Sequence, residues 1–314
     1  MMIENKFYLL MAGVVSLLTV ATVTGLILKR LARTDGAMAT VENLNLRINA
    51  WWSMIAVFVA SYLLGSTATV VLFAFVSLFA LREFITLTPT RLGDHNALFA
   101  AFFILIPLQY TFIGIGWYSM VTLLIPVYAF LFLPSIAVLS QETDGFLERA
   151  AKIQWGVMIT VYCISHAPAL LILDLKEFEG QNALLLFYLM FVVQISDVLQ
   201  YVFGKLFGKT KVAPVVSPSK TVEGLVGGGL AAVLAGGCMF WLTPFSFYQS
   251  LAMSFVIVVM GFLGGLTLSA IKRSLQAKDW GTMIKGHGGM LDRMDSVCFA
   301  APVFFHLTRY FFSA

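Results

Sequence analysis

Long apolar runs separated by short polar connections follow one another along almost the whole chain. Runs of spanning length lie at about 7–28, 49–64, 66–85, 97–114, 117–139, 153–173, 182–203, 222–242, 248–270 and 297–313. An α-helix of roughly 20 apolar residues crosses the hydrocarbon core of a bilayer. The pattern therefore predicts an all-α, polytopic membrane protein with about ten transmembrane helices. The range is about 8–10, because only Gly65 and Ser66 separate the short second run from the third.

Lys and Arg residues are distributed unequally between alternate connections. If the first helix runs from outside to inside, 17 of the 20 Lys and Arg residues lie in the inner connections. Only Lys6, Lys176 and Arg309 then lie outside. Because positive residues are retained on the cytoplasmic side during insertion, we expect the N-terminus outside and the charged loops in the cytoplasm.

The composition excludes a soluble globular protein. The chain is 60% hydrophobic and only 11% charged, and its mean hydropathy is +0.90. Topogenic Lys and Arg residues account for most of the net charge of +4, so this charge does not indicate an acidic partner, and no nucleic-acid partner is expected. We expect residues 1–45 to form an N-terminal membrane anchor and linker, and residues 46–314 to form one integral-membrane domain.

The polar residues are concentrated in one stretch, Ser269–Asp295. Its 27 residues include five Lys or Arg, three Asp, one His and four Gly. Lys272, Arg273 and Lys278 supply cations, and the glycines on both sides of His287 allow the backbone to approach an anion closely. Taken singly, the Lys272-Arg273 pair is typical of a stop-transfer cluster and His287 of an ordinary loop.

Asp292 and Asp295 are three residues apart at the expected start of the last helix. This spacing places both carboxylates on one face, where they can bind a hard cation such as Mg²⁺. Cations, flexible glycines and spaced acids together describe a site for a nucleoside triphosphate with its metal, because phosphoryl-type transfer depends mainly on charge neutralisation.

Asp197 lies near the cytoplasmic end of the otherwise apolar run 182–203. An acid at membrane depth costs several kcal/mol unless it is paired, bound to a cation or reached by water. Gln194, Gln200 and Tyr201 place a polar stripe around it. A metal or substrate site is favoured here over an interfacial acid that pairs with a loop lysine.

The loop at 204–221 ends in Ser217-Pro218-Ser219-Lys220-Thr221, just before a helix. Hydroxyl groups, free backbone N–H groups and Lys220 at a helix start suit a phosphate. An ordinary N-cap by Ser219 or Thr221 explains the same residues equally well. The helices on either side of 243–247 are rich in glycine, which predicts close backbone packing or, alternatively, a groove that admits a lipid chain.

These residues resemble a known family. The pattern S-x-I-K-R-x4-K-D-x-G-x2-I-x-G-H-G-G-M-x-D-R-M-D, with SPSKTVEG and Asp197 upstream, resembles the signature of the phosphatidate cytidylyltransferase (CDP-diacylglycerol synthase) family. The similarity covers about residues 46–314, and the first helix is similar to an extension found in a paralogous branch.

The resemblance implies a Mg²⁺-dependent reaction, with or without an additional monovalent cation. In it, CMP passes from CTP to phosphatidic acid or a related lipid phosphate, and CDP-diacylglycerol and pyrophosphate form. It also implies membrane lipid as a partner, a homodimer, and a location in the bacterial cytoplasmic membrane with the active site facing the cytoplasm. By this resemblance the metal and nucleotide are held by Asp197, Asp292 and Asp295. Catalysis also uses Lys272, Arg273 and Lys278, and substrate binding uses Ser217, Lys220, Thr221, Ser269, His287, Gly288, Gly289 and Arg293.

One departure from the family pattern leads to an alternative hypothesis. Family members usually carry Gly-Asp four residues before the signature serine, where this chain has Gly264-Gly265. The missing carboxylate motivates a non-catalytic or weakly active paralogue that binds nucleotide or anionic lipid. A transporter is the third hypothesis, and it is weaker because only one membrane-depth acid and no inverted repeat are visible.

Overall fold

The computed structural model describes residues 2–31, 35–176, 178–283 and 288–313. The longer α-helices are α1 (Met2–Leu31), α2 (Asp35–Leu63), α3 (Ser66–Leu87), α8 (Phe146–Val157), α10 (Asn182–Phe207), α11 (Gly229–Cys238), α12 (Phe247–Ser274) and α13 (Leu291–Phe312). The shorter ones are α4 (His95–Ala100), α5 (Ile106–Gly114), α6 (Tyr118–Leu123), α7 (Phe130–Val138) and α9 (Ile164–Ala169). Segments of π-helix are η2 (Ala101–Leu105), η3 (Leu124–Ala129), η4 (Met158–Cys163) and η6 (Gly224–Gly228). Short 3₁₀ turns are η1 (Leu92–Asp94), η5 (Leu170–Ile172) and η7 (Phe240–Leu242), and the strands are β1 (Lys211–Ala213) and β2 (Ser217–Thr221).

The helices confirm an all-α polytopic membrane protein. In the described part of the chain, seven helices are long and apolar enough to cross a bilayer. They are Lys6–Leu31, Ser66–Leu87, Leu92–Gly114, Tyr118–Val138, Phe146–Ile172, Asn182–Phe207 and Phe247–Ser274. The shorter apolar helices Trp51–Ala60 and Gly224–Cys238, with the more polar α13, correspond to the remaining predicted runs. The count of about ten stays a prediction.

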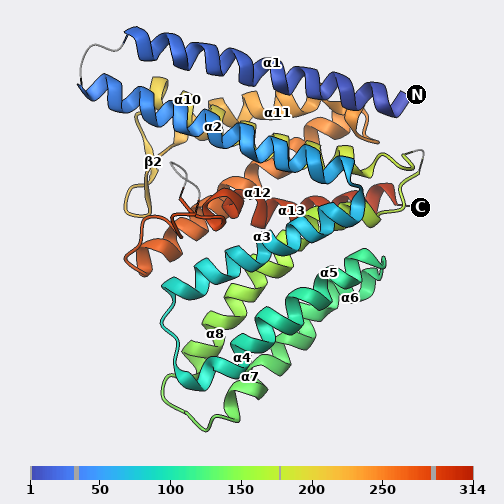
Figure 1. Cartoon of the computed structure of the whole chain (residues 1–314), viewed down its shortest axis with the longest axis vertical. Helices are drawn as coiled ribbons and strands as arrows, with labels where there is room; N and C mark the ends of the chain where they lie inside the picture. The colour runs from blue at the N-terminus through green and yellow to red at the C-terminus, as the bar shows by residue number, and fades with distance from the viewer. Residues whose placement is uncertain (1, 32–34, 177, 284–287, 314) are drawn as a thin grey trace.

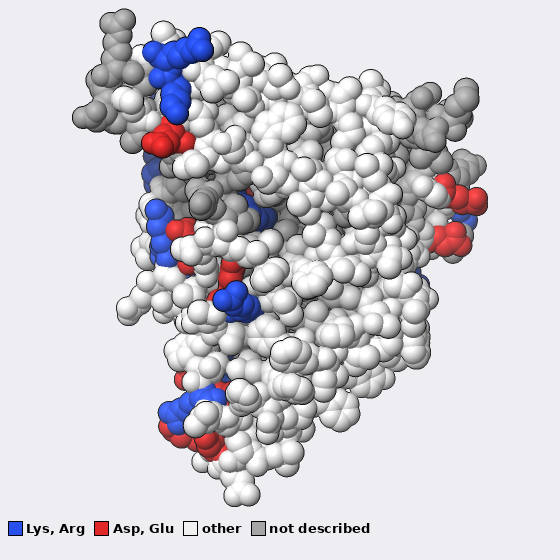
Figure 2. All heavy atoms as spheres, in the orientation of Figure 1, with Lys and Arg blue, Asp and Glu red and all other residues white. Residues whose placement is uncertain are grey.

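The connections lie on two sides of the helical body, as the alternation of charge predicts. Figure 1 shows both chain ends on one side, and β2, the α7–α8 connection and the adjoining ends of α12 and α13 on the other. In Figure 2 most Lys, Arg, Asp and Glu atoms lie along that second side, a smaller group lies opposite, and the broad region between them is white. This division suits an apolar belt in lipid with charged loops in water.

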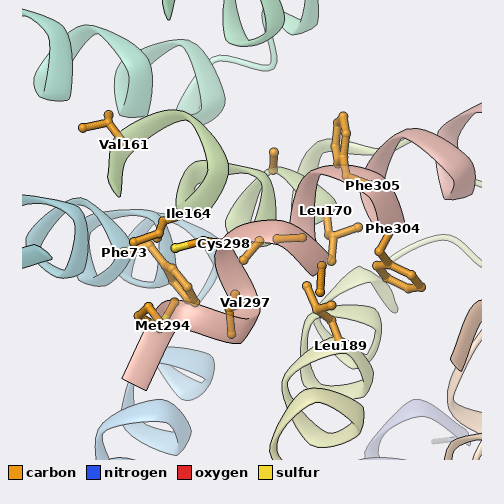
Figure 3. Close-up of a cluster of buried hydrophobic side chains, with 14 of the residues drawn as sticks. Phe73, Val161, Ile164, Leu170, Leu189, Met294, Val297, Cys298, Phe304 and Phe305 are labelled. Carbon is orange, nitrogen blue, oxygen red and sulfur yellow. The ribbon is translucent and has the colours of Figure 1, made fainter. Parts of the chain in front are cut away.

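Helix α13 forms the centre of the core. It packs against α3, η4, α9, α10 and α12. Figure 3 shows its Met294, Val297 and Cys298 beside Phe73 and Ile164, with Phe304 and Phe305 farther along the same helix. Val297, Cys298, Phe304 and Phe305 have 0% exposure. Because α13 packs against five other elements along its length, its N-terminal part is held in place, and Asp292 and Asp295 lie in that part of the helix.

Glycines let the helices around the site approach closely, which confirms the close-packing prediction. A Cβ on Gly228 of η6 would lie 2.5 Å from the backbone of Gln200 in α10. A Cβ on Gly264 of α12 would lie 2.7 Å from the carbonyl oxygen of Asp295 in α13. Because real Cβ atoms do not approach this closely, only glycine allows these contacts. The polar residues of α10, α12 and α13 thereby come within reach of one another.

The structure differs from the predicted elements in two places. The predicted loop at 204–221 contains an antiparallel hairpin, in which Lys211 pairs with Thr221 and Ala213 with Ser217. Strands of three and five residues are too short to show a period-2 pattern. The second difference is that α2 runs unbroken from Asp35 to Leu63, so the predicted boundary between residues 45 and 46 falls inside a helix rather than in a linker.

Candidate active site

The charged ends of several elements meet on the side of the molecule opposite the chain termini (Figure 1). Helix α10 contacts β2, η6, α12 and α13, and α12 contacts both β2 and α13. Helices α10, α12 and α13 are apolar along most of their length and carry their Asp and Lys residues near this end. The site is therefore assembled from parts of the chain that are far apart in sequence.

Asp197 and Asp295 form a carboxylate pair joined by Ser296. The hydroxyl of Ser296 lies 3.0 Å from Oδ2 and 3.3 Å from Oδ1 of Asp197 and donates to that carboxylate. The backbone N–H of Ser296 donates to Oδ1 of Asp295 at 2.7 Å, and its hydroxyl is 3.5 Å from the same oxygen. Ser296 is buried, whereas Asp197 remains exposed. A buried hydroxyl thus fixes two acids from different helices with oxygen lone pairs to spare.

Lys220 reaches the carboxylate pair from β2. Its Nζ lies 3.5 Å from the carbonyl oxygen of Phe262 and 4.7 Å from the centre of the Phe262 ring. Burial lowers the pKa of Lys220, the charges of Asp197 and Asp295 oppose this lowering, and the charge of Lys272 adds to it. These interactions show that two acids and two lysines share one electrostatic cluster.

Lys272 and Asp292 form a buried ion pair beside this cluster. The Nζ of Lys272 donates to Oδ1 of Asp292 at 2.7 Å, and the two side chains are 9% and 5% exposed. The other oxygen of Asp292 accepts the backbone N–H groups of Trp280 and Gly289, each at 2.8 Å. Both carboxylate oxygens of Asp292 are therefore occupied by donors from the protein, as in a structural anchor.

The structure separates the three acids that were predicted to bind one metal. Asp197 and Asp295 lie together, whereas Asp292 is held by Lys272 and by the signature loop, which comprises the described residues 275–283 and 288–290 between α12 and α13. Among the described residues, no group of three or more His, Cys, Asp or Glu side chains could hold a metal ion. Mg²⁺ is commonly bound by only one or two carboxylates, with substrate phosphates and water completing its octahedron. The pair Asp197 and Asp295 fits such an ion; the metal itself stays a prediction.

Gly265 faces directly into the cluster. A Cβ built on it would lie 2.8 Å from Nζ of Lys220, 3.4 Å from the hydroxyl of Ser296 and 3.9 Å from Oδ2 of Asp295. A side chain at this position would therefore point at the carboxylate pair. A carboxylate on residue 265 would therefore belong to the same site. The ammonium group of Lys220 lies where that carboxylate would project.

Three other predicted residues make hydrogen bonds to the protein backbone. Thr221 is buried, and its hydroxyl accepts the backbone N–H of Gly224 at 3.1 Å, which confirms the N-cap interpretation for this residue. Arg273 is exposed and donates to the carbonyl oxygens of Val216 at 3.4 Å and Ala277 at 3.1 Å. Ser269 donates to the carbonyl oxygen four residues earlier in its own helix, at 2.6 Å.

The remaining predicted residues differ in burial and in the element that carries them. Ser217 is buried in β2 and Lys278 is exposed. Gly288 has a φ of +79°, which glycine adopts without strain. Arg293 is half-buried, and its buried Nε has no hydrogen-bond partner among the described residues. His287 lies outside the described residues.

Two residues that organise the site were not predicted from the sequence to belong to it. Ser296 directly follows the second signature aspartate, and its neighbours in sequence do not reveal that it bridges two helices. Glu83 lies in α3, and its carboxylate accepts the backbone N–H groups of Met290 and Leu291, each at 2.9 Å. Glu83 could have been predicted from the sequence because it is an acid inside an otherwise apolar run, the feature from which Asp197 was predicted.

Comparison with known proteins shows the family of this chain. The model of the cytidylyltransferase family matches residues 45–311. The chain belongs to this family. It is 38% identical over 304 residues to the uncharacterized protein YnbB of Escherichia coli, covering 96% of this chain and 97% of that one. It is 30% identical to the phosphatidate cytidylyltransferase of Staphylococcus haemolyticus over 250 residues, covering 79% and 92% of the two chains. The phosphatidate cytidylyltransferase of Bacillus subtilis is 30% identical over 239 residues, covering 75% and 86%.

Proposed function

We propose that this protein transfers CMP from CTP to phosphatidic acid, or to a related lipid phosphate, and forms CDP-diacylglycerol and pyrophosphate. The observation that carries the proposal is the carboxylate pair Asp197 and Asp295, fixed by Ser296 beside Lys220. The relatives named phosphatidate cytidylyltransferase support the substrate assignment. In this proposal the site faces the cytoplasm of a bacterium, where CTP is available, from the cytoplasmic membrane.

The reaction joins two anions, so the protein must neutralise charge and align the reactants. An oxygen of the lipid phosphate attacks the α-phosphorus of CTP, and a new P–O bond forms. The bond from that phosphorus to the oxygen bridging to the β-phosphate breaks, and pyrophosphate leaves with the electron pair. In this proposal Lys220 and Arg293 attract the phosphates, and Lys272 holds the first turn of α13 in position through Asp292.

Asp197 and Asp295 are the residues that would hold Mg²⁺. When bound, this ion supplies charge neutralisation on the triphosphate that a lysine alone supplies less well. Ser296 keeps the two carboxylates at a fixed separation and orientation. The exposure of Asp197 leaves one face of the pair open to a ligand.

Transfer of radiolabelled CMP tests the proposal. Purified protein, CTP, Mg²⁺ and mixed micelles of phosphatidic acid should yield labelled lipid. Asp197→Asn and Asp295→Asn should each lower the rate about 100-fold or more, because a lost metal carboxylate costs several kcal/mol of transition-state stabilisation. Asp174→Asn, an exposed acid in the connection between η5 and α10, is the matched control and should leave the rate unchanged. No labelled lipid at any Mg²⁺ concentration would overturn the proposal.

Gly265 supports a second candidate function, a non-catalytic protein that binds nucleotide or anionic lipid. Gly265→Asp would add a carboxylate beside Asp295, and the flexible end of Lys220 can move aside for it. Gly265→Ala displaces Lys220 without adding charge and is the matched control. If the wild type is inactive and only Gly265→Asp gains transferase activity, the non-catalytic function is favoured. If the wild type is active and neither variant is faster, the transferase is favoured.

A further inference from the structure

Glu83 connects α3 to the signature loop, and it lies outside the signature in sequence. It is near the C-terminal end of α3 (Ser66–Leu87) and half-buried. Its Oε1 accepts the backbone N–H of Met290 and its Oε2 accepts that of Leu291, each at 2.9 Å. Met290 lies 207 residues later in the chain. One carboxylate therefore binds two successive amides of a distant segment.

Those two amides belong to the start of α13. Met290 is its N-cap residue and Leu291 its first helical residue. The first N–H groups of a helix have no partner within the helix, and a negative charge is favourable beside them. Met290 has no hydrogen bond from its own side chain to the helix end. Glu83 thus supplies, from another helix, the acceptor that an Asp or Ser at the N-cap would supply locally.

The loop is built around this carboxylate. A Cβ on Gly281 would lie 2.8 Å from Oε1 of Glu83, and a Cβ on Gly289 would collide with the same side chain. The next residue of α3, Phe84, stacks on Trp280 with ring centres 5.3 Å apart and an angle of 23° between the planes. Two glycines and one aromatic residue of the loop therefore fit against successive residues of α3.

We infer that Glu83 is a positioning residue that fixes the signature loop in the conformation that binds the nucleotide. The same loop donates the amides of Trp280 and Gly289 to Asp292, and this network ends at the Lys272 ion pair. Loss of the Glu83 carboxylate releases one side of the loop while leaving the carboxylate pair in place. The nucleotide part of this inference rests on the proposed function.

Hydrogen–deuterium exchange tests the positioning role without any activity. The full-length protein in detergent is compared with Glu83→Ala and Glu83→Gln, and peptides covering 278–292 are followed. Loss of both hydrogen bonds in Glu83→Ala should raise their exchange rates about 10-fold, and Glu83→Gln, which keeps one acceptor oxygen, should show a smaller rise. Glu148→Gln removes an exposed carboxylate from an ion pair with Lys152 and is the matched control.

Steady-state kinetics then test the link to the nucleotide. Glu83→Gln should raise KM for CTP about 10-fold with a smaller change in kcat and in KM for the lipid, as is typical when a supporting residue of a binding site is removed. Glu83→Asp, which retains the charge, should recover part of the affinity.

The outcomes separate the inference from the proposed function. Unchanged exchange at 278–292 in both neutral variants overturns the positioning role, and a general loss of exchange protection in all peptides of both variants overturns a role confined to the loop. Faster exchange confined to the loop supports the role even if the wild type shows no transfer. Faster exchange with an unchanged KM for CTP overturns the link to the nucleotide.

Discussion

Asp292 lies in the first turn of α13 and accepts hydrogen bonds from three donors. These bonds indicate that its carboxylate has a structural role. One oxygen accepts from Lys272, and the other accepts the amides of Trp280 and Gly289. Three of the roughly four lone-pair sites of this buried carboxylate are therefore used by donors of the protein. Its contribution is to join α12, the signature loop and α13.

Breaking the pair of Lys272 and Asp292 should destabilise the protein strongly. Lys272→Ala leaves a buried carboxylate without its cation, and removal of one partner of a buried ion pair costs about 3–5 kcal/mol. We expect a clear drop in Tm in detergent, measured by the fluorescence of a thiol or tryptophan probe. Lys152→Ala breaks the exposed ion pair with Glu148 and should leave Tm nearly unchanged. Equal drops for the two variants would contradict the structural importance of the buried pair.

The fall of activity at alkaline pH should follow the deprotonation of Lys220. Burial lowers the pKa of this lysine from its ordinary value of 10.5. The ammonium group is present below the folded-state pKa, so attraction of phosphate is complete at low pH and is lost as pH rises through a value below 10.5. As the pH is raised, kcat/KM for CTP should therefore begin to fall at a lower pH than it would if Lys220 had the ordinary pKa of a lysine. Lys220→Arg stays charged and should remove this fall; an identical fall in the variant would assign it to another group.

At the scale of elements, hydropathy predicts the helices because each has to satisfy its backbone hydrogen bonds within lipid. It does not predict the start of α2. Residues 35–48 are polar enough to be interpreted as a linker, but they are helical in the structure. Hydropathy also misses the hairpin at 211–221, whose two strands form a two-stranded sheet with each other. Asp197, Lys272 and Asp295 do lie near the neighbouring ends of α10, α12 and α13. Their pairing depends on contacts between distant segments, such as Ser296 with Asp197 and Glu83 with Met290, which no local pattern records.

The hairpin is tied to the following helix by Glu223. Its carboxylate accepts the backbone N–H groups of Lys209 and Thr210 at 3.0 and 3.1 Å. Hydrogen bonds from its own backbone N–H and from that of Lys209 lower the pKa of Glu223 to about 2. The tether is therefore complete above the ordinary pKa of 4.5 and is lost only as pH falls through about 2.

Removal of this tether should expose the hairpin to protease. Lys209 and Lys211 are exposed trypsin sites beside the tethered amides. Glu223→Ala should speed cleavage at these two lysines about 10-fold, because two charge-assisted hydrogen bonds are lost. Cleavage should be followed by mass spectrometry of the fragments at neutral pH. Glu148→Gln again serves as the control, and an unchanged rate in Glu223→Ala would show that the hairpin is held by its strand pairing alone.

At the scale of the whole molecule, the position of the site follows from the arrangement of the loops. Most charged side chains, β2 and the adjoining ends of α12 and α13 lie on one side, and both chain ends lie on the other (Figures 1 and 2). A water-soluble nucleotide and a lipid phosphate can meet only where the helical body reaches the surface of the bilayer. The distribution of Lys and Arg residues predicts that this surface is the cytoplasmic one.

Cysteine labelling in intact cells should decide the orientation. The three native cysteines, which are free thiols, are first replaced by alanine or serine. Single cysteines are then introduced at two exposed positions, Lys209→Cys beside the hairpin and Glu179→Cys on the opposite side. A membrane-impermeant maleimide should label Glu179→Cys in intact cells with an opened outer membrane, and Lys209→Cys only after the cytoplasmic membrane is permeabilised. The reverse pattern would place the site on the side that CTP does not reach, and would contradict both the orientation and the proposed reaction.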